Sequence, residues 1–380
     1  MKELPVLPAE TRRLLAPFWA AQEERAPGGR PRNGSFPAGN GAPEHQKPMP
    51  IASLSLFFEK FCPVLVDTAN WHQPKGIEKK GDFYRHLIRY RSPDMETYIQ
   101  DCSSRRHRLL HRLKMQGYQW RYLKAETTWN LIVGIGNAHV LETGLTLNRM
   151  YGFPYLPGST VKGLTRYFAS MALAAELAIP TDDEVVGKLW LEILEIPEEQ
   201  RRRQRLRKLI AQATAGGSEA PDEPADSSEA AMAATVARWD EKVHLFQRVF
   251  GVLGQKGAVI FFDALPEVKQ NERLPLVVDI VNPHYGPYYV GNDQPAPPAD
   301  YYHPKPVQFL CVGPKACFRF YVATTDPELL AQVIDSTKGW LPRALGTWGI
   351  GAKTRSGYGQ MQILDAPVHK GGRRNGGRHE

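Results

Sequence analysis

The stretch from 349 to 359 constrains this chain most, because it holds two Gly-x-Gly triplets separated by five residues. Glycine adopts positive φ without a Cβ penalty and lets a ligand approach the backbone closely. The pattern predicts a tight loop that presents N–H donors, hydroxyls and two cations, and these groups suit phosphate. The alternative is a glycine-rich turn that only joins a helix to a last strand. The residues expected to contact phosphate are Gly349, Gly351, Lys353, Thr354, Arg355, Ser356, Gly357, Tyr358 and Gly359.

The phosphate could belong to a nucleotide or to a nucleic-acid backbone. A nucleotide-binding P-loop requires Gly-x-x-x-x-Gly-Lys-Ser/Thr between a strand and a helix. Gly346 and Gly351 have the required separation, but Ala352 stands where the lysine is needed. Residues 360–364 alternate like a strand, whereas a P-loop leads into a helix. An ATPase is therefore disfavoured, and a nucleic-acid backbone is the better ligand.

Composition excludes several classes of protein. At 380 residues and 42% hydrophobic content, the chain can build one large domain with insertions, or two domains. No apolar run approaches the roughly 20 residues needed to cross a bilayer, and the first residues lack a signal-peptide pattern. The four cysteines include no C-x-x-C pair, which argues against a zinc cluster or a disulfide framework. We expect a cytoplasmic protein with no membrane partner.

The basic residues are concentrated in three segments, and the net charge is +8. Residues 105–124 contain seven Lys or Arg side chains and no acidic one, interleaved with Tyr118, Trp120 and Tyr122. Such a mixture suits single-stranded nucleic acid, because cations meet phosphates and flat rings stack on bases. The run at 201–208 carries six cations, but it could equally be the solvated face of a helix. The tail at 369–380 is expected to be disordered.

The order of elements predicts an α+β fold. Residues 1–125 form an N-terminal extension with a Pro/Gly-rich arm. It is expected to be mostly helical, with a short helix near 11–24 and another over 98–114. Residues 126–368 read as strand, helix, strand, strand, helix, strand, which is the ferredoxin-like order that RRM-type RNA-binding domains also use. A helical and disordered insertion interrupts this domain at about 181–245. The expected helices of the domain are 158–177, 241–250 and 327–345, and its expected strands are 128–133, 139–147, 257–264, 274–281, the hairpin of 307–312 with 317–323, and 360–364.

A second anion site is predicted at the start of the helix at 158–177. Ser159 and Thr160 place two hydroxyls there, with Ser159 as the expected N-cap. Lys162 and Arg166 are spaced i and i+4, so they share a face and could meet one phosphate track. Free N–H groups and the positive end of the helix dipole favour anions. The alternative is a capped helix whose cations are merely solvated.

One histidine has a candidate catalytic role. His284 lies among three tyrosines in residues 282–289 and could act as the general base of a metal-free ribonuclease. It could equally hydrogen-bond within a rigid Pro-Gly loop. No acid or second histidine accompanies it in a matching motif, and the scattered carboxylates lack metal-ligand spacing. We therefore expect no catalytic residue, no metal and no cofactor, and we count His284 among the RNA-binding candidates.

Together these motifs resemble a known family. The Pro-Gly-Ser-Thr-Val-Lys-Gly segment at 157–163, Phe-Phe-Asp-Ala-Leu-Pro at 261–266, Asn-Pro-His-Tyr-Gly at 282–286 and the terminal glycine loop are similar, in this order, to the RAMP superfamily of CRISPR proteins. Within it they resemble the sixth subunit of the type III-B (Cmr) effector complex. The resemblance covers about 127–365. The resemblance does not extend to residues 1–125 or to the insertion, so it implies no role for them.

The resemblance implies a non-catalytic subunit of a ribonucleoprotein that defends against viruses. Such a subunit caps the end of the complex at the 3′ side of the guide RNA and contributes to guide and target RNA binding. Its neighbours would be the repeated backbone RAMP subunit, the small helical subunit and the terminal RAMP subunit. Some relatives process guide precursors as metal-free endoribonucleases with a histidine, so the alternative function is RNA processing by His284.

Overall fold

The computed structural model describes most of the chain from Lys80 onward. The described residues are 54, 58, 66–67, 70–74, 80–89, 95–137, 139, 141–214, 226–268, 275–283, 288, 297 and 303–364. The helix expected near 11–24 and the basic tail lie outside them. The part of the insertion expected to be disordered, 216–230, lies outside them up to 225, whereas 226–230 is helical, contrary to the prediction.

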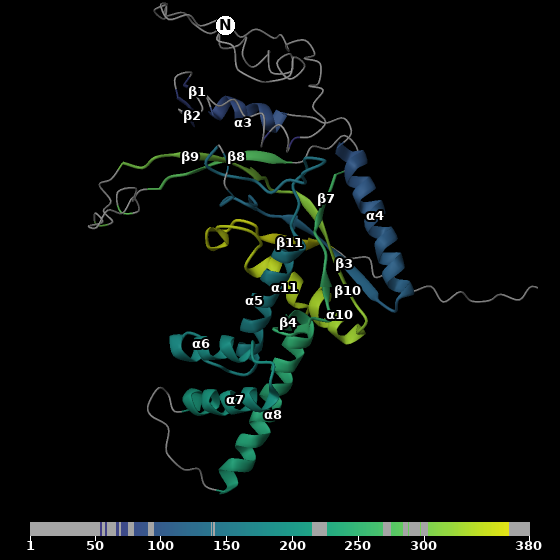
Figure 1. Cartoon of the computed structure of the whole chain (residues 1–380), viewed down its shortest axis with the longest axis vertical. Helices are drawn as coiled ribbons and strands as arrows, with labels where there is room; N and C mark the ends of the chain where they lie inside the picture. The colour runs from purple at the N-terminus through teal and green to yellow at the C-terminus, as the bar shows by residue number, and fades with distance from the viewer. Residues whose placement is uncertain are drawn as a thin grey trace, which may run out of the picture.

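A five-stranded antiparallel sheet organises the molecule (Figure 1). Its strand order is β11-β3-β10-β6, and β7 also pairs with β10. In the register, Leu123 faces Phe320 and Ala125 faces Ile363. The strands are β3 (Gln119–Thr127), β6 (Ile260–Phe261), β7 (Leu265–Glu267), β10 (Cys317–Thr324) and β11 (Met361–Leu364).

The two faces of this sheet differ because successive side chains of a strand point to opposite sides. On one side Leu123, Phe318 and Phe320 are fully buried in the main hydrophobic core. The helices on this side are α5 (Gly158–Glu176), α10 (Pro327–Ile334) and α11 (Trp340–Thr347). On the other side, α4 (Met95–Met115) packs along β3 and β7 (Figure 1).

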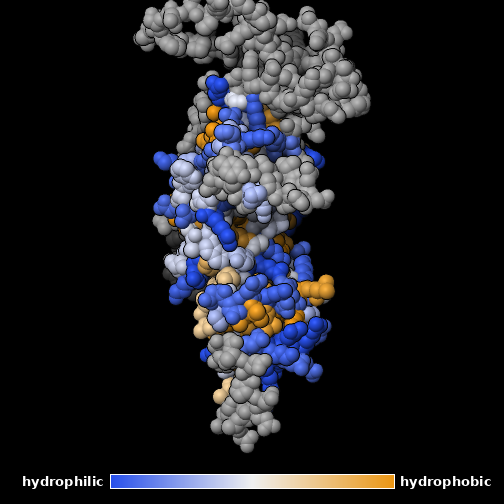
Figure 2. Space-filling model, turned by 90° about the vertical axis from the view of Figure 1, so that its left-hand side faces the viewer, coloured by the Kyte–Doolittle hydropathy of each residue, from blue (hydrophilic) through white to orange (hydrophobic). Residues whose placement is uncertain are grey.

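The helical insertion extends away from the sheet (Figure 1). It consists of α6 (Glu184–Ile193), α7 (Glu199–Thr214) and α8 (Asp226–Phe250), held together by fully buried Trp190, Leu206 and Phe246. Arg202, from the basic run at 201–208, is only 4% exposed and its Nε donates to Asp240 at 2.5 Å. Figure 2 shows a largely hydrophilic face, with hydrophobic residues gathered in its lower half.

A second antiparallel sheet is formed by β8 (Leu276–Val281) and β9 (Val307–Val312). An isolated bridge between Leu131 and Val312 joins it to the segment after β3. Helix α3 (Lys80–Arg89) packs on it, and the hydroxyl of Tyr84 donates to the carbonyl of Gln308 at 3.3 Å. Short pairs are β1 (Val66–Asp67) with β2 (Asn70–Pro74), and β4 (Gly251–Val252) with β5 (Gln255–Lys256).

Several predicted elements are confirmed. They are the helices at 98–114 and 158–177 and the strands at 274–281, 307–312, 317–323 and 360–364, each within a few residues of the observed bounds. The helix expected at 241–250 is also present, but it is the last part of a longer helix that begins at Asp226. The mixed α/β architecture with an antiparallel sheet is likewise observed. Among the described helices, none is both long enough and apolar enough to span a membrane.

Other predictions were wrong. The first strand of the main sheet is 119–127, in a region expected to be helical, and 128–133 contains only the bridge at Leu131. Of the described residues in 139–147, only Leu147 forms a β-bridge, and 257–264 contributes the short β6 and a bridge at Ala264. The strands β9 and β10 do not pair, because β9 joins β8 whereas β10 joins β3. The helix expected over 327–345 is divided where the Asp335 side chain accepts N–H bonds from Thr337 and Lys338.

Candidate nucleic-acid interface

The glycine loop joins α11 to β11, and its glycines are required by its backbone. Gly349, Gly351, Gly357 and Gly359 all have positive φ, between 72° and 102°. A Cβ on Gly351 would collide with the carbonyl oxygen of Ile132, and one on Gly359 with that of Ile350. These glycines therefore let the loop fold tightly on itself and on the segment after β3.

Part of the backbone of the loop is used internally. The N–H of Ile350 donates to Gly359 at 2.9 Å, and the N–H of Ala352 donates to Ile132 at 2.8 Å. By contrast, the N–H groups of Gly351, Lys353, Thr354, Arg355 and Tyr358 have no hydrogen-bond partner among the described residues. The loop thus has a fixed inner side and an outer side that can donate to a ligand.

The outer side is cationic. Lys353, which is itself left-handed with φ 56°, and Arg355 are both exposed, and neither forms an ion pair within the described part of the chain. Thr354 and Ser356 add two hydroxyls in a single 3-10 turn. Two unpaired cations beside free N–H groups on a rigid loop form an arrangement that suits phosphate oxygens.

A hydrogen-bonded carboxylate ties the loop to the second sheet. The Tyr358 hydroxyl and the Asn130 amide both donate to Asp279 Oδ2 of β8 at 2.8 Å. Burial opposes ionisation of Asp279, but the bonds from Tyr358, Asn130 and the N–H of Ile280 hold its pKa below the usual range. Burial and the bond to Asp279 raise the pKa of Tyr358 to about 12. The tether fixes the position of the loop relative to β8.

The sequence interpretation missed Trp129 as a site residue. Its side chain is 54% exposed, and its neighbours bond the end of the loop: Thr128 N–H donates to Gln360, and Gly359 N–H donates to Asn130. An exposed indole beside a cationic loop offers a stacking surface for a base. The sequence interpretation placed Trp129 within the strand expected at 128–133 and assigned it no role.

The predicted anion site at the start of α5 is arranged differently. The helix begins at Gly158 with Pro157 at the N-cap and no side-chain cap bond, so the expected capping by Ser159 is wrong. The N–H of Gly158 donates to Asp263 Oδ1 at 2.7 Å, which places a carboxylate of this chain at the helix start. Ser159 is exposed and Thr160 half-exposed, so their hydroxyls remain accessible.

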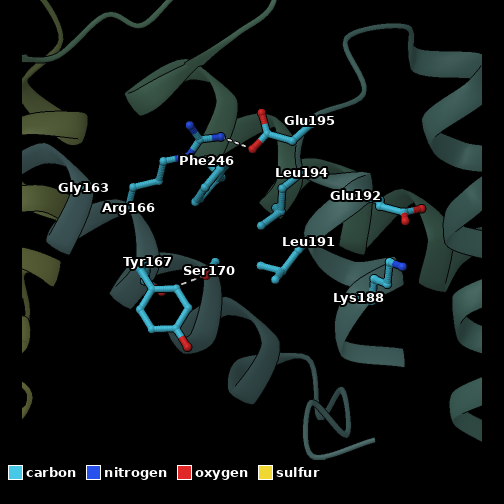
Figure 3. A pocket seen from close by; sticks show the side chains of 10 residues that line it. All are labelled: Gly163, Arg166, Tyr167, Ser170, Lys188, Leu191, Glu192, Leu194, Glu195 and Phe246. Atoms are coloured by element: carbon cyan, nitrogen blue, oxygen red, sulfur yellow. Dashed lines mark hydrogen bonds and ion pairs between the residues drawn. The ribbon is translucent and has the colours of Figure 1, made fainter. Parts of the chain in front are cut away.

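The cations of α5 are also partly engaged. Arg166 pairs with Glu195 and lies 5.4 Å from the Phe246 ring centroid, within a pocket of about 460 Å³ between α5, α6 and α8 (Figure 3). Burial, and then the charge of Arg166, lower the pKa of Lys162. The pair therefore does not form the open cationic track that its spacing suggested.

The structure does not bring the two motifs together. The glycine loop leads into β11 at one edge of the main sheet, whereas a Cβ on Gly158 would meet Phe261 of β6 at the opposite edge. Trp348, just before the loop, does pack on Tyr167 and Phe168 further along α5, with ring centroids 5.1 and 5.0 Å apart.

A model of the RAMP superfamily matches residues 124–362 of this chain. The chain belongs to the RAMP superfamily. The protein named CRISPR system Cmr subunit Cmr6, from Pyrococcus furiosus, is 33% identical to it over 249 residues, covering 63% of this chain and 66% of that relative. The chain thus aligns with a little under two thirds of this relative's length, and the resemblance to the sixth Cmr subunit is confirmed.

Two solved structures are also similar to this RAMP chain. A cryo-EM structure of the Type III-B Cmr-beta bound to cognate target RNA includes a chain 20% identical, with 82% of this chain and 80% of that chain covered and a TM-score of 0.45. The crystal structure of Cmr6 from Pyrococcus furiosus is 28% identical, with 66% and 99% covered and a TM-score of 0.35. Because both TM-scores lie below 0.5, the family assignment rests on the sequence matches.

The remaining site predictions for this RAMP protein concern catalysis. His284 lies outside the described residues, so its role stays a prediction. Within the part of the chain that the structure describes, no group of three or more His, Cys, Asp or Glu side chains could hold a metal ion. The expectations of no metal, no cofactor and no catalytic residue likewise stay predictions.

Proposed function

We propose that this RAMP protein is a non-catalytic RNA-binding subunit of a type III-B CRISPR effector complex, in which the glycine loop holds the RNA backbone. The observation that carries the proposal is the pair of exposed, unpaired cations Lys353 and Arg355 beside free N–H groups on a loop with fixed backbone. Similarity to Cmr6 supports the type of complex. The loop offers no base-edge recognition code, so it contacts RNA of any sequence.

The proposed position is the end of the complex at the 3′ side of the guide RNA. There the protein contacts guide and target RNA and adjoins the backbone RAMP subunit, the small helical subunit and the terminal RAMP subunit. The order β3, α5, β6, β10, α10–α11, β11 with strands arranged β11-β3-β10-β6 supports a ferredoxin-like interpretation of the main domain.

The test of this function is reconstitution. The full-length chain is mixed with the other type III-B subunits and a guide RNA, and the products are separated by size-exclusion chromatography. We expect the chain to elute with the complex and to crosslink to RNA through 349–359. Assembly without any RNA crosslink in this protein would instead indicate a purely structural subunit.

The competing function is RNA processing by His284. Purified full-length protein is incubated with CRISPR repeat RNA in EDTA, alongside the His284→Ala variant. We expect the RNA to remain intact in both samples. Cleavage by the unmodified protein that the variant lacks would overturn the non-catalytic assignment.

A further inference from the structure

The face of the main sheet opposite the core holds an aromatic and basic surface that the glycine loop does not use. Trp120 and Tyr122 of β3 point to this face, because they alternate with buried Leu123. Helix α4 lies along the same face and contributes His107, whose ring centroid is 6.3 Å from that of Trp120. We call these three residues, together with the α4 cations described below, the sheet-face patch.

The rings of the patch have fixed positions. Trp120 and Tyr122 are stacked at an interplanar angle of 27°, with centroids 6.4 Å apart. Both contact Tyr321 of β10, which is 2% exposed. The ring centroid of Tyr321 lies 6.0 Å from that of Trp120 and 5.4 Å from that of Tyr122. The Tyr321 hydroxyl lies 3.3 Å from His107 Nε2. Because buried Tyr321 lies beside them on the neighbouring strand, the half-buried Trp120 and Tyr122 form a rigid platform with part of its area open to a ligand.

Some cations near the platform hold the protein together. Arg106 donates to the carbonyl of Asp263 and lies 5.7 Å from the Tyr321 centroid. Arg319 pairs with Glu267 and lies 5.2 Å from the Tyr122 centroid. Lys124 also binds Glu267, at 2.8 Å. Glu267 is thus already neutralised by two cations of the chain, and Glu126, which alternates with buried Ala125 and Thr127, is a further acid on this face.

Other cations of α4 are available. Arg108, Arg112 and Lys114 are exposed, and none of them has an ion-pair partner among the described residues. His107, His111 and Lys114 follow the spacing i, i+4, i+7, so they share one side of the helix. The contact between His107 and Trp120 places that side next to the platform. Residues 105–124 contain no acidic side chain to offset this charge.

We propose that the sheet-face patch binds single-stranded RNA without reading its sequence. Bases stack on Trp120 and Tyr122, while phosphates meet Lys114 beside the platform and then Arg108 and Arg112, which are spaced i and i+4 on the adjoining side of α4, farther from the sheet. The excess of cations selects a polyanion, and the flat half-open rings favour unpaired bases over an acidic protein, which would need only the charges. The proposal does not depend on the glycine loop, which lies after α11 rather than on this face.

The test uses the full-length protein and fluorescein-labelled oligouridylate and oligoadenylate, with affinity measured by anisotropy over a range of salt concentrations. Replacing Arg112 and Lys114 together by Ala should weaken the binding of both oligonucleotides. It should also lower the slope of log affinity against log salt concentration by about 2. Trp120→Leu should weaken binding about tenfold while leaving the salt slope unchanged. The matched control replaces exposed Arg201 and Lys208 of α7 by Ala, and it should bind as the unmodified protein does.

Ultraviolet crosslinking of the unmodified protein, followed by peptide mapping, keeps the test decisive if Trp120→Leu fails to fold. Crosslinks within 119–122 support the proposal. The absence of crosslinks within 119–122 overturns the proposal. So does an unchanged RNA affinity of the Arg112/Lys114 variant, or a patch variant that loses a partner protein while it keeps its RNA affinity. The Lys353/Arg355 double variant is measured in parallel. If only the Lys353/Arg355 variant loses RNA affinity, the glycine loop binds RNA and the patch does not. If only the patch variants lose affinity, the patch binds RNA and the loop does not.

Discussion

The glycine loop and the start of α5 have similar sequences but different structures. Each combines glycine, hydroxyls and two cations. In the loop, Lys353 and Arg355 are exposed and unpaired within the described chain. At the helix start, Asp263 accepts the N–H of Gly158 and Glu195 holds Arg166, from positions 105 and 29 residues away. A short motif therefore shows which groups are present, whereas distant residues decide whether those groups are free to bind a ligand.

The largest effect on stability is expected from substituting a glycine of the loop whose backbone packs closely on its neighbours. Gly351→Ala places a Cβ against the carbonyl oxygen of Ile132 at a φ of 102°, so we expect the free energy of unfolding to fall by about 2–3 kcal/mol. The control is Gly357→Ala, where φ is also positive at 85° but no atom lies within 4 Å of the added Cβ. It should cost about 1 kcal/mol. Urea denaturation measures both, and equal losses would mean that close packing does not define the loop.

The next effect concerns stacking. Trp129→Ala should lower the affinity for single-stranded RNA roughly tenfold, because the exposed indole beside the loop loses a base contact. Tyr167→Ala is the matched control on α5, since its side chain is 56% exposed, similar to the 54% of Trp129. Fluorescence anisotropy compares them. If both variants lost RNA affinity equally, RNA binding could not be assigned to the loop rather than to α5.

The tether between loop and β8 should have a smaller effect and a dependence on pH. Tyr358→Phe removes one hydrogen bond to Asp279 and should lower stability by about 1 kcal/mol at neutral pH. The pKa of Tyr358 is raised to about 12, above the ordinary value of 10, so its contribution is complete below pH 10 and is lost as pH rises through 12. The pKa of Asp279 is lowered, so the carboxylate's contribution is lost only in acid.

Urea denaturation at a series of pH values tests this tether. Tyr167→Phe is the control, because its hydroxyl has no hydrogen-bond partner among the described residues. A difference between Tyr358→Phe and the unmodified protein that persisted unchanged above pH 12 would contradict the assignment.

The smallest effect is expected at the helix start. Arg166→Ala removes a partly exposed ion pair with Glu195 and a contact with Phe246, which should lower stability by about 1 kcal/mol or less. Its RNA affinity should stay unchanged, since the guanidinium is engaged within the protein. Thermal unfolding and anisotropy measure the two quantities. A loss of RNA affinity without a loss of stability would reverse the roles assigned to the helix start and the loop.

The sequence predicted elements best where local patterns decide them. Helices α4 and α5 and strand β11 follow from periodicity, and the positive φ values of the loop follow from its glycines. Prediction from the sequence failed where residues distant in the chain determine the structure. The pairing of β9 with β8 rather than β10 and the capture of Gly158 by Asp263 depend on tertiary contacts that no short window contains. The exposure of Trp129 likewise depends on how 128–133 leaves the sheet.

The salt dependence of RNA binding tests the central claim most directly. Affinity for two unrelated RNA sequences is measured over a range of salt for the unmodified protein, for Lys353→Ala with Arg355→Ala, and for Lys162→Ala with Arg166→Ala. The account predicts that the loop variant weakens binding to both sequences and lowers the salt slope by about 2, while the helix variant changes the slope little. A slope that is unchanged in the loop variant and reduced in the helix variant would contradict it.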